Sequence, residues 1–329
     1  MSNMLSLRLV AAGCAAALTL AACGGGGSDN APEATSTTVA NTTGNAGGSG
    51  GTGAAVPTDA GAPALSGDIA TDGLNWINFR RSQIGISQLT RSTLIDRTAL
   101  GHSNYQKENN TISHEQVAGK TGFTGVQLGD RLAQAGYTFN TSASRAYGEV
   151  ISATNNKSGV FMAEELITAI YHRFVIFEPI FKELGSGAAT TPSGYTYFTT
   201  DFAANNGYGT GISGLVVWPY SNQVNVAPNF FSDYESPDPV PNQNEVGYPV
   251  SVHANINATV AVQSFTIRPR GGSDMAVRLL ARSVDAETPV SVAAIVPLTP
   301  LRSATVYDVS FSGAVNGIPV TKTWSFTTR

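Results

Sequence analysis

Both cysteines of this 329-residue chain lie within its first 23 residues, at Cys14 and Cys23. Everything that follows them has no thiol for a disulfide bond, a zinc–thiolate site or a cysteine nucleophile. The chain must therefore fold by packing alone, and 42% of its residues are apolar, which is enough for a sizeable core. Only 13% are charged, with a formal net charge of −4. Because this balance lacks the cationic face that nucleic acid requires, we expect no nucleic-acid partner.

The first 22 residues have the form of an export signal. Arg8 supplies a positive charge, and an apolar run of 14 residues follows at positions 9–22, whereas a membrane-spanning helix needs about 20. The run ends in the letters LAAC at positions 20–23, which resemble the lipobox of bacterial lipoproteins. The alternative is an ordinary signal peptide that ends near a cysteine. The resemblance implies an extracytoplasmic protein whose Cys23 is lipidated and anchors it to the membrane, with Gly24 favouring the outer membrane of a cell that has one.

Residues 23–66 contain no aromatic side chain and consist mostly of Gly, Ala, Thr and Ser. Such a stretch buries too little apolar surface to offset its ordering entropy, so it is predicted to be a disordered tether. We therefore expect four parts: a lipoprotein signal peptide (1–22), the lipidated Cys23 with its tether (23–66), a domain at 67–211 and a second domain at 212–329.

Helical periodicity begins after the tether. Apolar residues recur on one face over residues 74–84 and again over residues 94–105. The strongest pattern predicts one helix over residues 161–177, stopped by Pro179. Residues 195–202 alternate in the manner of a strand. Helices with a few strands between them indicate an α+β domain.

This segment also carries short motifs in a fixed order, namely ALGHS (99–103), ISH (112–114), TGFTG (121–125), GDR (129–131), AGY (135–137), GE (148–149), YHR (171–173) and LGSG (184–187). Over about residues 70–206 they resemble the bacterial SCP-like branch of the CAP superfamily, which includes cysteine-rich secretory and pathogenesis-related proteins. The resemblance implies a three-layer α-β-α sandwich. It also implies a cleft with two histidines and two acidic residues, which in some relatives binds a divalent cation.

Matched residue by residue, the resemblance places His114, Glu149 and His172 in this cleft. The second acidic residue has no direct match, since Ala169 stands three positions before His172, but Glu165 lies two helical turns before it and could substitute. Imidazole and carboxylate ligands suit zinc, magnesium or calcium, and three protein ligands leave a position open for water or substrate. The alternative is that these residues are hydrogen-bonded parts of the fold. No cofactor is required by the sequence, and a divalent cation is the candidate.

Three other features favour structural interpretations. His102 stands among apolar residues of a predicted helix and is expected in the interior. Asp130 and Arg131 are expected to form a structural ion pair or a turn. Residues 232–249 hold acidic side chains among prolines without the spacing of a calcium loop, so we expect a solvated loop.

After residue 214 the pattern becomes that of strands. Seven runs are strand candidates: residues 215–218, 248–253, 260–267, 277–280, 290–296, 306–311 and 320–326. Asn316 and Gly317 predict the turn of a final hairpin. The ending TWSFTT resembles bacterial Ig-like domains of surface proteins. We therefore expect an all-β Ig-like sandwich after the α-β-α sandwich.

The predicted function is that of a cell-envelope lipoprotein whose CAP domain binds a small apolar ligand or a cell-wall component in the cleft lined by histidine and glutamate. One alternative is a metal-dependent hydrolase, in which a cation on His114 and His172 activates water and Glu149 acts as general base. The other is a non-catalytic adhesion or scaffold module. We prefer binding to catalysis.

Overall fold

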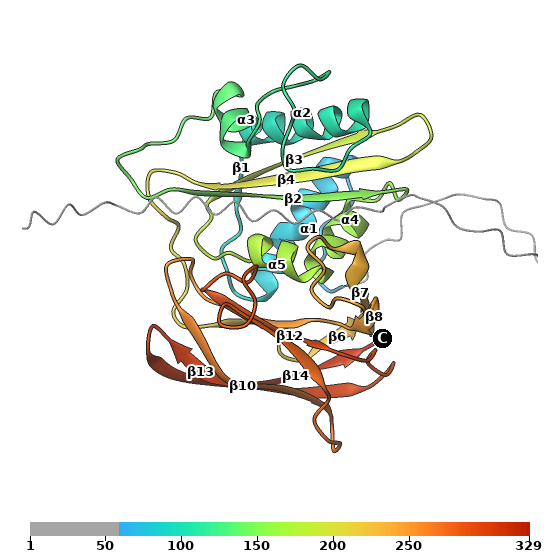
Figure 1. Ribbon diagram of the computed structural model, residues 1–329, viewed down its shortest axis with the longest axis vertical. Coiled ribbons are helices and arrows are strands. Elements are labelled where there is room, and N and C mark those ends of the chain that lie inside the picture. The colour runs from blue at the N-terminus through green and yellow to red at the C-terminus, as the bar shows by residue number, and fades with distance from the viewer. Residues whose placement is uncertain (1–58) are drawn as a thin grey trace, which may run out of the picture.

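The structure is a computed structural model that describes residues 59–329 (Figure 1). The predicted signal peptide, Cys23 and the tether up to residue 58 lie outside the described residues. The helices of the described part are α1 (Ile69–Gln83), α2 (Thr93–Asn109), α3 (Leu128–Gln134), α4 (Gly159–Thr168), α5 (Ile170–Ile176) and the 3₁₀ turn η1 (Ser232–Tyr234). None of these helices has the length and apolar character needed to cross a bilayer.

The strands of the described part are β1 (Thr90–Arg91), β2 (Ala146–Thr154), β3 (Glu183–Thr190), β4 (Thr196–Ala204), β5 (Val216–Trp218), β6 (Gln223–Val226), β7 (Asn229–Phe231), β8 (Glu245–Gly247), β9 (Val250–His253), β10 (Val260–Pro269), β11 (Val277–Ala281), β12 (Val292–Pro297), β13 (Val306–Val315) and β14 (Ile318–Thr328). They form four sheets.

The first sheet has the order β1-β3-β4-β2, with β2 at its edge. Helices α2 and α3 cover one face, while α1, α4 and α5 lie against the other (Figure 1). Helix α2 approaches β3 so closely that a Cβ at Gly185 or Gly187 would overlap the backbone of the helix. Those glycines therefore set the distance between this helix and the sheet.

Two further four-stranded sheets, β10-β13-β14-β6 and β11-β12-β9-β5, make up most of the carboxy-terminal part, beside the β7-β8 ribbon. All seven strand runs expected after residue 214 are strands. The last hairpin turns at Asn316 and Gly317, both with positive φ, and Val315 pairs with Ile318 across the turn. The turn predicted at these two residues is therefore confirmed.

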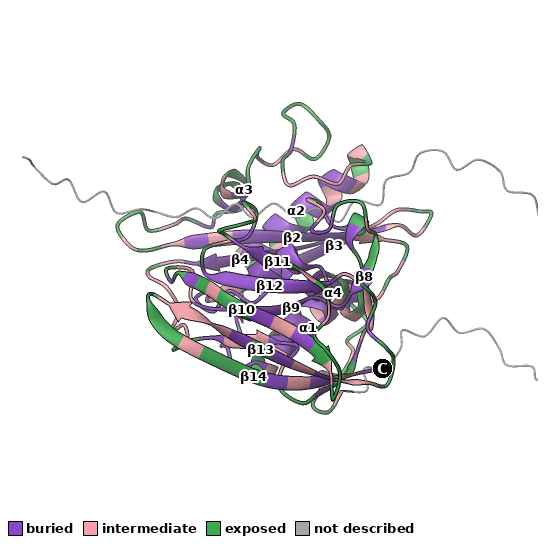
Figure 2. Cartoon of the chain, turned by 60° about the horizontal axis from the view of Figure 1, so that its bottom comes forward, coloured by how far each residue is buried: buried purple, intermediate pink, exposed green. Residues whose placement is uncertain are grey.

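The predicted fold class, an α+β three-layer α-β-α sandwich followed by an all-β Ig-like sandwich, is wrong for this chain. In residues 59–329, fourteen strands in four sheets predominate over five α-helices. The layer of α1, α4 and α5 is not an outer layer, because one continuous apolar core runs from Leu74 through Trp218 to Phe326. Strands β4, β9 and β12 are buried throughout, whereas β10 and β14 keep exposed stretches (Figure 2).

The single helix expected over residues 161–177 is also wrong. The chain leaves helical geometry at Ala169, where φ is −67° and ψ is 121°, so α4 ends and α5 begins there. Every residue of α5 is buried. A helix that is buried on all sides shows no amphipathic stripe, and its limits are therefore poorly marked in the sequence.

Candidate functional site

Glu149 is the centre of a buried charged cluster on the side of the first sheet covered by α2 and α3. Its Oε2 accepts a hydrogen bond from Arg131 of α3 at 2.6 Å, and its Oε1 bonds to His114 Nδ1 at 2.8 Å. Arg131 also donates to the main-chain carbonyl of His114 at 2.8 Å. Glu149 is 3% exposed and Arg131 is 1% exposed. The cluster thus ties the loop after α2 to strand β2.

The electrostatics of this cluster favour an ionised Glu149. Burial by itself raises the pKa of Glu149, but the positive charge of Arg131, with the neighbouring His102 and His114, brings that pKa far below its usual range. A general base works best with a pKa near the ambient pH, so this carboxylate is a poor proton acceptor. Asp201 pairs with Glu149 across β2 and β4, and burial followed by the charge of Glu149 raises the pKa of Asp201.

His102 completes the cluster as an interior residue, as the sequence predicts. Its Nε2 lies 2.7 Å from the Ser113 carbonyl, and its Nδ1 lies 2.9 Å from the Gln116 amide nitrogen. This pattern places the hydrogen on Nε2, because a carbonyl can only accept. Burial lowers the pKa of His102 to about 4, so the ring is neutral near pH 7.

The structure does not bring His172 to the pair formed by His114 and Glu149. Side chains alternate along a strand, so Glu149 and Ser152 of β2 point to opposite faces of the sheet. The Ser152 hydroxyl donates to Glu165 of α4 at 2.9 Å, on the side where α4 and α5 pack. His172 is on α5 and belongs to that second side.

Glu235 is the partner of His172. The Glu235 Oε1 lies 3.0 Å from His172 Nδ1 and accepts from the main-chain nitrogens of Tyr171 and His172, while Oε2 accepts from that of Ile170. Helix α5 has no capping side chain of its own at Ala169. A carboxylate from the carboxy-terminal segment therefore caps this helix and orients His172. Both side chains are buried.

Glu165 lies near His172 although the helix between them is interrupted. Burial raises the pKa of Glu165, and the hydrogen bond from Ser152 and the neighbouring His172 ring oppose this shift. The side chain nevertheless stays open to solvent. A carboxyl group that is both partly desolvated and open to solvent is typical of a concave surface.

A groove of about 1420 Å³ contains Glu165 and His172. It runs between α4, the outer end of β2 and the segment 223–234 that carries β6 and β7. Three aromatic side chains are exposed in residues 59–329, Phe161, Phe231 and Tyr234, and all three line this groove.

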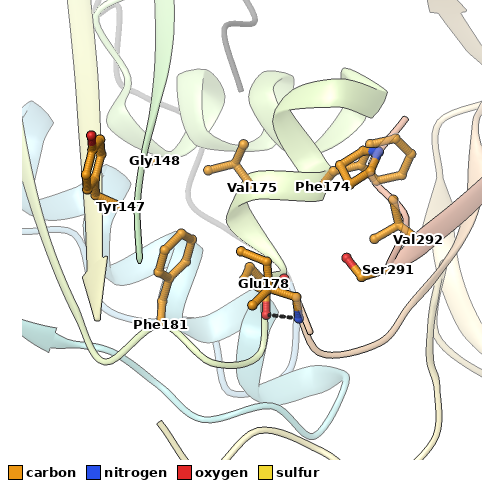
Figure 3. Close-up of a pocket in the computed structure, with 10 residues that line it drawn as sticks. Tyr147, Gly148, Phe174, Val175, Glu178, Phe181, Ser291 and Val292 are labelled. Atoms are coloured by element: carbon orange, nitrogen blue, oxygen red, sulfur yellow. Dashed lines mark hydrogen bonds between the residues drawn. The ribbon is translucent and has the colours of Figure 1, made fainter. Parts of the chain in front are cut away.

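A second hollow is far smaller, at about 20 Å³ (Figure 3). It lies between α5 and the carboxy-terminal sheets, and Glu178 on its wall accepts a hydrogen bond from the Ile256 main-chain nitrogen at 3.1 Å. Burial raises the pKa of Glu178 to about 8. Its size suits about one water molecule, so it is a packing feature rather than a ligand site.

Within residues 59–329 no group of three or more His, Cys, Asp and Glu side chains is arranged to hold a metal ion. The candidate ligands divide between two places: His114 and Glu149 on one side of the first sheet, and His172 and Glu165 on the other. The residues therefore do not fit the expected shared cation centre.

No sequence pattern marked Glu235, Arg131 and Asp201 as members of these clusters. Glu235 falls in the segment expected to be a solvated loop, yet it is 2% exposed. Arg131 pairs with Glu149 rather than with its neighbour Asp130, which instead accepts from the Gln127 main-chain nitrogen at 3.0 Å at the start of α3. Asp201 alternates with apolar residues of β4, and no spacing in the sequence marks it.

Comparison with known proteins gives limited likenesses. No protein-family model matches the chain, and no curated protein matches it. Among solved structures, an extracellular protein containing an SCP domain from Bacillus anthracis is similar, with 25% identity and a TM-score of 0.34. The match covers 41% of this chain and 39% of that chain. An outer surface protein from Borrelia burgdorferi has 15% identity and a TM-score of 0.33, over 40% of this chain and 89% of that one.

Proposed function

We propose that the chain is an extracytoplasmic, lipid-anchored protein that binds a cell-wall component in the groove between α4 and β7. The observation that carries this proposal is the concentration of exposed aromatic side chains, because every one in the described residues lies in this groove. Exposed aromatic groups gathered in one hollow are typical of a binding site and are otherwise a liability in water.

The size of the groove favours an extended ligand. Pockets for small molecules usually have volumes of about 300–1,000 Å³, and this groove is larger, at about 1420 Å³. Its lining combines aromatic groups with charged ones such as Lys157 and Glu165. A polymer with both apolar and polar faces matches this surface better than a small apolar ligand does.

The clusters favour binding over hydrolysis. Both oxygens of Glu149 are engaged by Arg131 and His114, and the low pKa of this carboxylate opposes a role as general base. These contacts count against the hydrolase alternative in which Glu149 is the general base.

Sedimentation with purified peptidoglycan sacculi tests this function. The full chain carrying Cys23→Ser, purified without detergent, is expected to sediment with sacculi in a saturable manner. The double variant Phe231→Ala with Tyr234→Ala is expected to bind about tenfold more weakly, as the loss of aromatic contacts implies. Ile318→Ala removes an exposed apolar side chain outside the groove and serves as the control.

Absence of sedimentation, or equal binding by the double variant and the control, would contradict the proposal. The anchor has a separate test. Cys23→Ser is expected to release the protein from the membrane fraction, and continued retention would exclude lipidation at Cys23.

A further inference from the structure

His172 has a buried ring nitrogen without a hydrogen-bond partner beside the groove. The side chain is 1% exposed and lines the groove, and its Nε2 has no hydrogen-bond partner among residues 59–329. Its Nδ1 faces a Glu235 oxygen that already accepts two main-chain N–H groups, so Nδ1 carries the hydrogen. In the neutral ring, Nε2 is then a hydrogen-bond acceptor. A buried polar atom without a partner is costly, and a ligand that donates to it would remove this cost.

Glu165 adds a negative charge that the described part of the chain does not neutralise. The residue makes no ion pair within residues 59–329, and its one side-chain hydrogen bond there comes from Ser152. Arg80, which also lines the groove, already pairs with Asp59 at 2.7 Å and with Glu164 at 2.9 Å, and Lys157 of the same lining makes no ion pair with Glu165 within residues 59–329. Glu165 therefore remains available to a cation from outside the protein.

We propose that the floor of the groove binds a primary ammonium group carried by the cell-wall polymer, with Glu165, His172 Nε2 and Ser152 Oγ as its acceptors. An ammonium group has three N–H donors and one positive charge. The three proposed acceptors match these three donors in number, and the Glu165 carboxylate among them matches the positive charge in sign. This inference rests on the proposed function for its polymer, while the ammonium site itself is argued from the Ser152–Glu165 hydrogen bond, the unpartnered His172 nitrogen and the place of all three residues in the groove lining.

A divalent cation is the competing occupant. Zinc in proteins usually has at least three protein ligands, and no such group exists in residues 59–329. Ammonium recognition needs only acceptors in hydrogen-bonding range and a nearby carboxylate. The observations therefore favour the amine.

The experiment compares sacculi that keep their free amines with sacculi whose amines have been acetylated by acetic anhydride, in buffer with EDTA. The protein is the full chain with Cys23→Ser, alone and with Glu165→Gln. Acetylation is expected to weaken binding of the parent chain about tenfold or more, as the loss of a charge-assisted hydrogen bond implies. Glu165→Gln is expected to bind both preparations with the same low affinity. Glu287→Gln, which removes an exposed carboxylate outside the groove, is expected to behave as the parent does.

A second probe keeps the inference testable without sacculi. The capped peptide acetyl-Ala-Lys-Ala-amide and its Nε-acetylated form are titrated by calorimetry into the parent chain and into Glu165→Gln. Binding is expected for the free amine with the parent chain, with a loss of about tenfold on acetylation or in the variant.

The outcomes separate the two proposals. Equal binding to native and acetylated sacculi would overturn the ammonium site and leave the cell-wall function standing. No binding to either preparation would overturn the function, and the peptide titration would then decide the ammonium site. The same measurements are repeated without EDTA, and amine binding that is seen only without EDTA would assign the site to a metal ion and overturn the inference.

Discussion

Removal of the Glu235 carboxylate is expected to destabilise the whole described part of the chain. The carboxylate accepts from three main-chain nitrogens at the start of α5, at 2.7, 2.8 and 3.1 Å, and from His172 Nδ1 at 3.0 Å. Hydrogen bonds to a charged group contribute about 1.5–3 kcal/mol each, but they are not additive within one cluster. Removing one partner of a buried pair typically costs about 3–5 kcal/mol, and we expect Glu235→Ala to lower the free energy of unfolding by about that amount.

Glu235→Gln is expected to fall between Glu235→Ala and the parent. The amide keeps one acceptor oxygen, but its nitrogen would face main-chain N–H donors, so part of the cap is lost. The matched control is Asp233→Ala, which removes an exposed carboxyl from the 3₁₀ turn that directly precedes Glu235 and is expected to change the unfolding free energy by less than about 0.5 kcal/mol.

Urea unfolding followed by tryptophan fluorescence measures these differences. Trp76 of α1 and Trp218 of β5 are both buried in the one continuous core, so they report from the two parts of the chain. A single transition is expected for the parent chain and for each variant. A Glu235→Ala protein as stable as the Asp233→Ala protein would refute the reasoning.

Three further predictions concern buried charges. The pKa of Glu178 is about 8 in the folded chain against 4.5 when unfolded, so its contribution to stability is full below pH 4.5 and is lost as the pH rises through 8. Glu178→Gln should abolish that decline in urea unfolding at pH 5 and pH 9, and an unchanged slope would count against it. Burial, and then the Arg173 charge, lowers the pKa of His253 to about 3 from 6.5, so stability should fall as the pH drops from 6.5 toward 3. The fall should be smaller in His253→Gln by thermal unfolding at pH 7 and pH 4.5; an equal fall would exclude His253 as its source. Arg131→Met leaves Glu149 buried without its cation and should cost about 3–5 kcal/mol in urea unfolding, part of which Arg131→Met with Glu149→Gln should restore, whereas no recovery would show that the pair is not coupled.

Local patterns predicted the individual elements well. The periodicity over residues 74–84 and 94–105 corresponds to α1 and α2, and the strand runs after residue 214 correspond to β5 and β9 through β14. These patterns depend on burial of one face, which repeats along the sequence with the period of the element.

The break at Ala169 could not be predicted from local sequence. Its cause is Glu235, more than 60 positions away, which supplies the cap that lets α5 begin again. The groove could not be predicted for a similar reason, since Tyr234 lies in the segment 232–249 expected to be a solvated loop, and Phe231 directly precedes it. The packing of the sheets around α1, α4 and α5 likewise could not be predicted. The periodicity of an element shows which of its faces is buried, but it does not show which other element that face contacts.

The resemblance identified residues of both clusters but not their separation. His114 and Glu149 come together because a loop after α2 is held to β2 by Arg131. His172 lies on the opposite side of the first sheet because α5, all of whose residues are buried, packs there and is capped by Glu235.

The central claim is that ligand contacts the groove side of the first sheet and not the Glu149 cluster. The most direct measurement is the sacculus dissociation constant of two variants with the same chemical change, Glu165→Gln and Glu149→Gln, at a temperature where both are folded. We predict that Glu165→Gln raises this constant about tenfold while Glu149→Gln leaves it within about twofold of the parent value. A raised constant for Glu149→Gln with an unchanged one for Glu165→Gln would contradict the account.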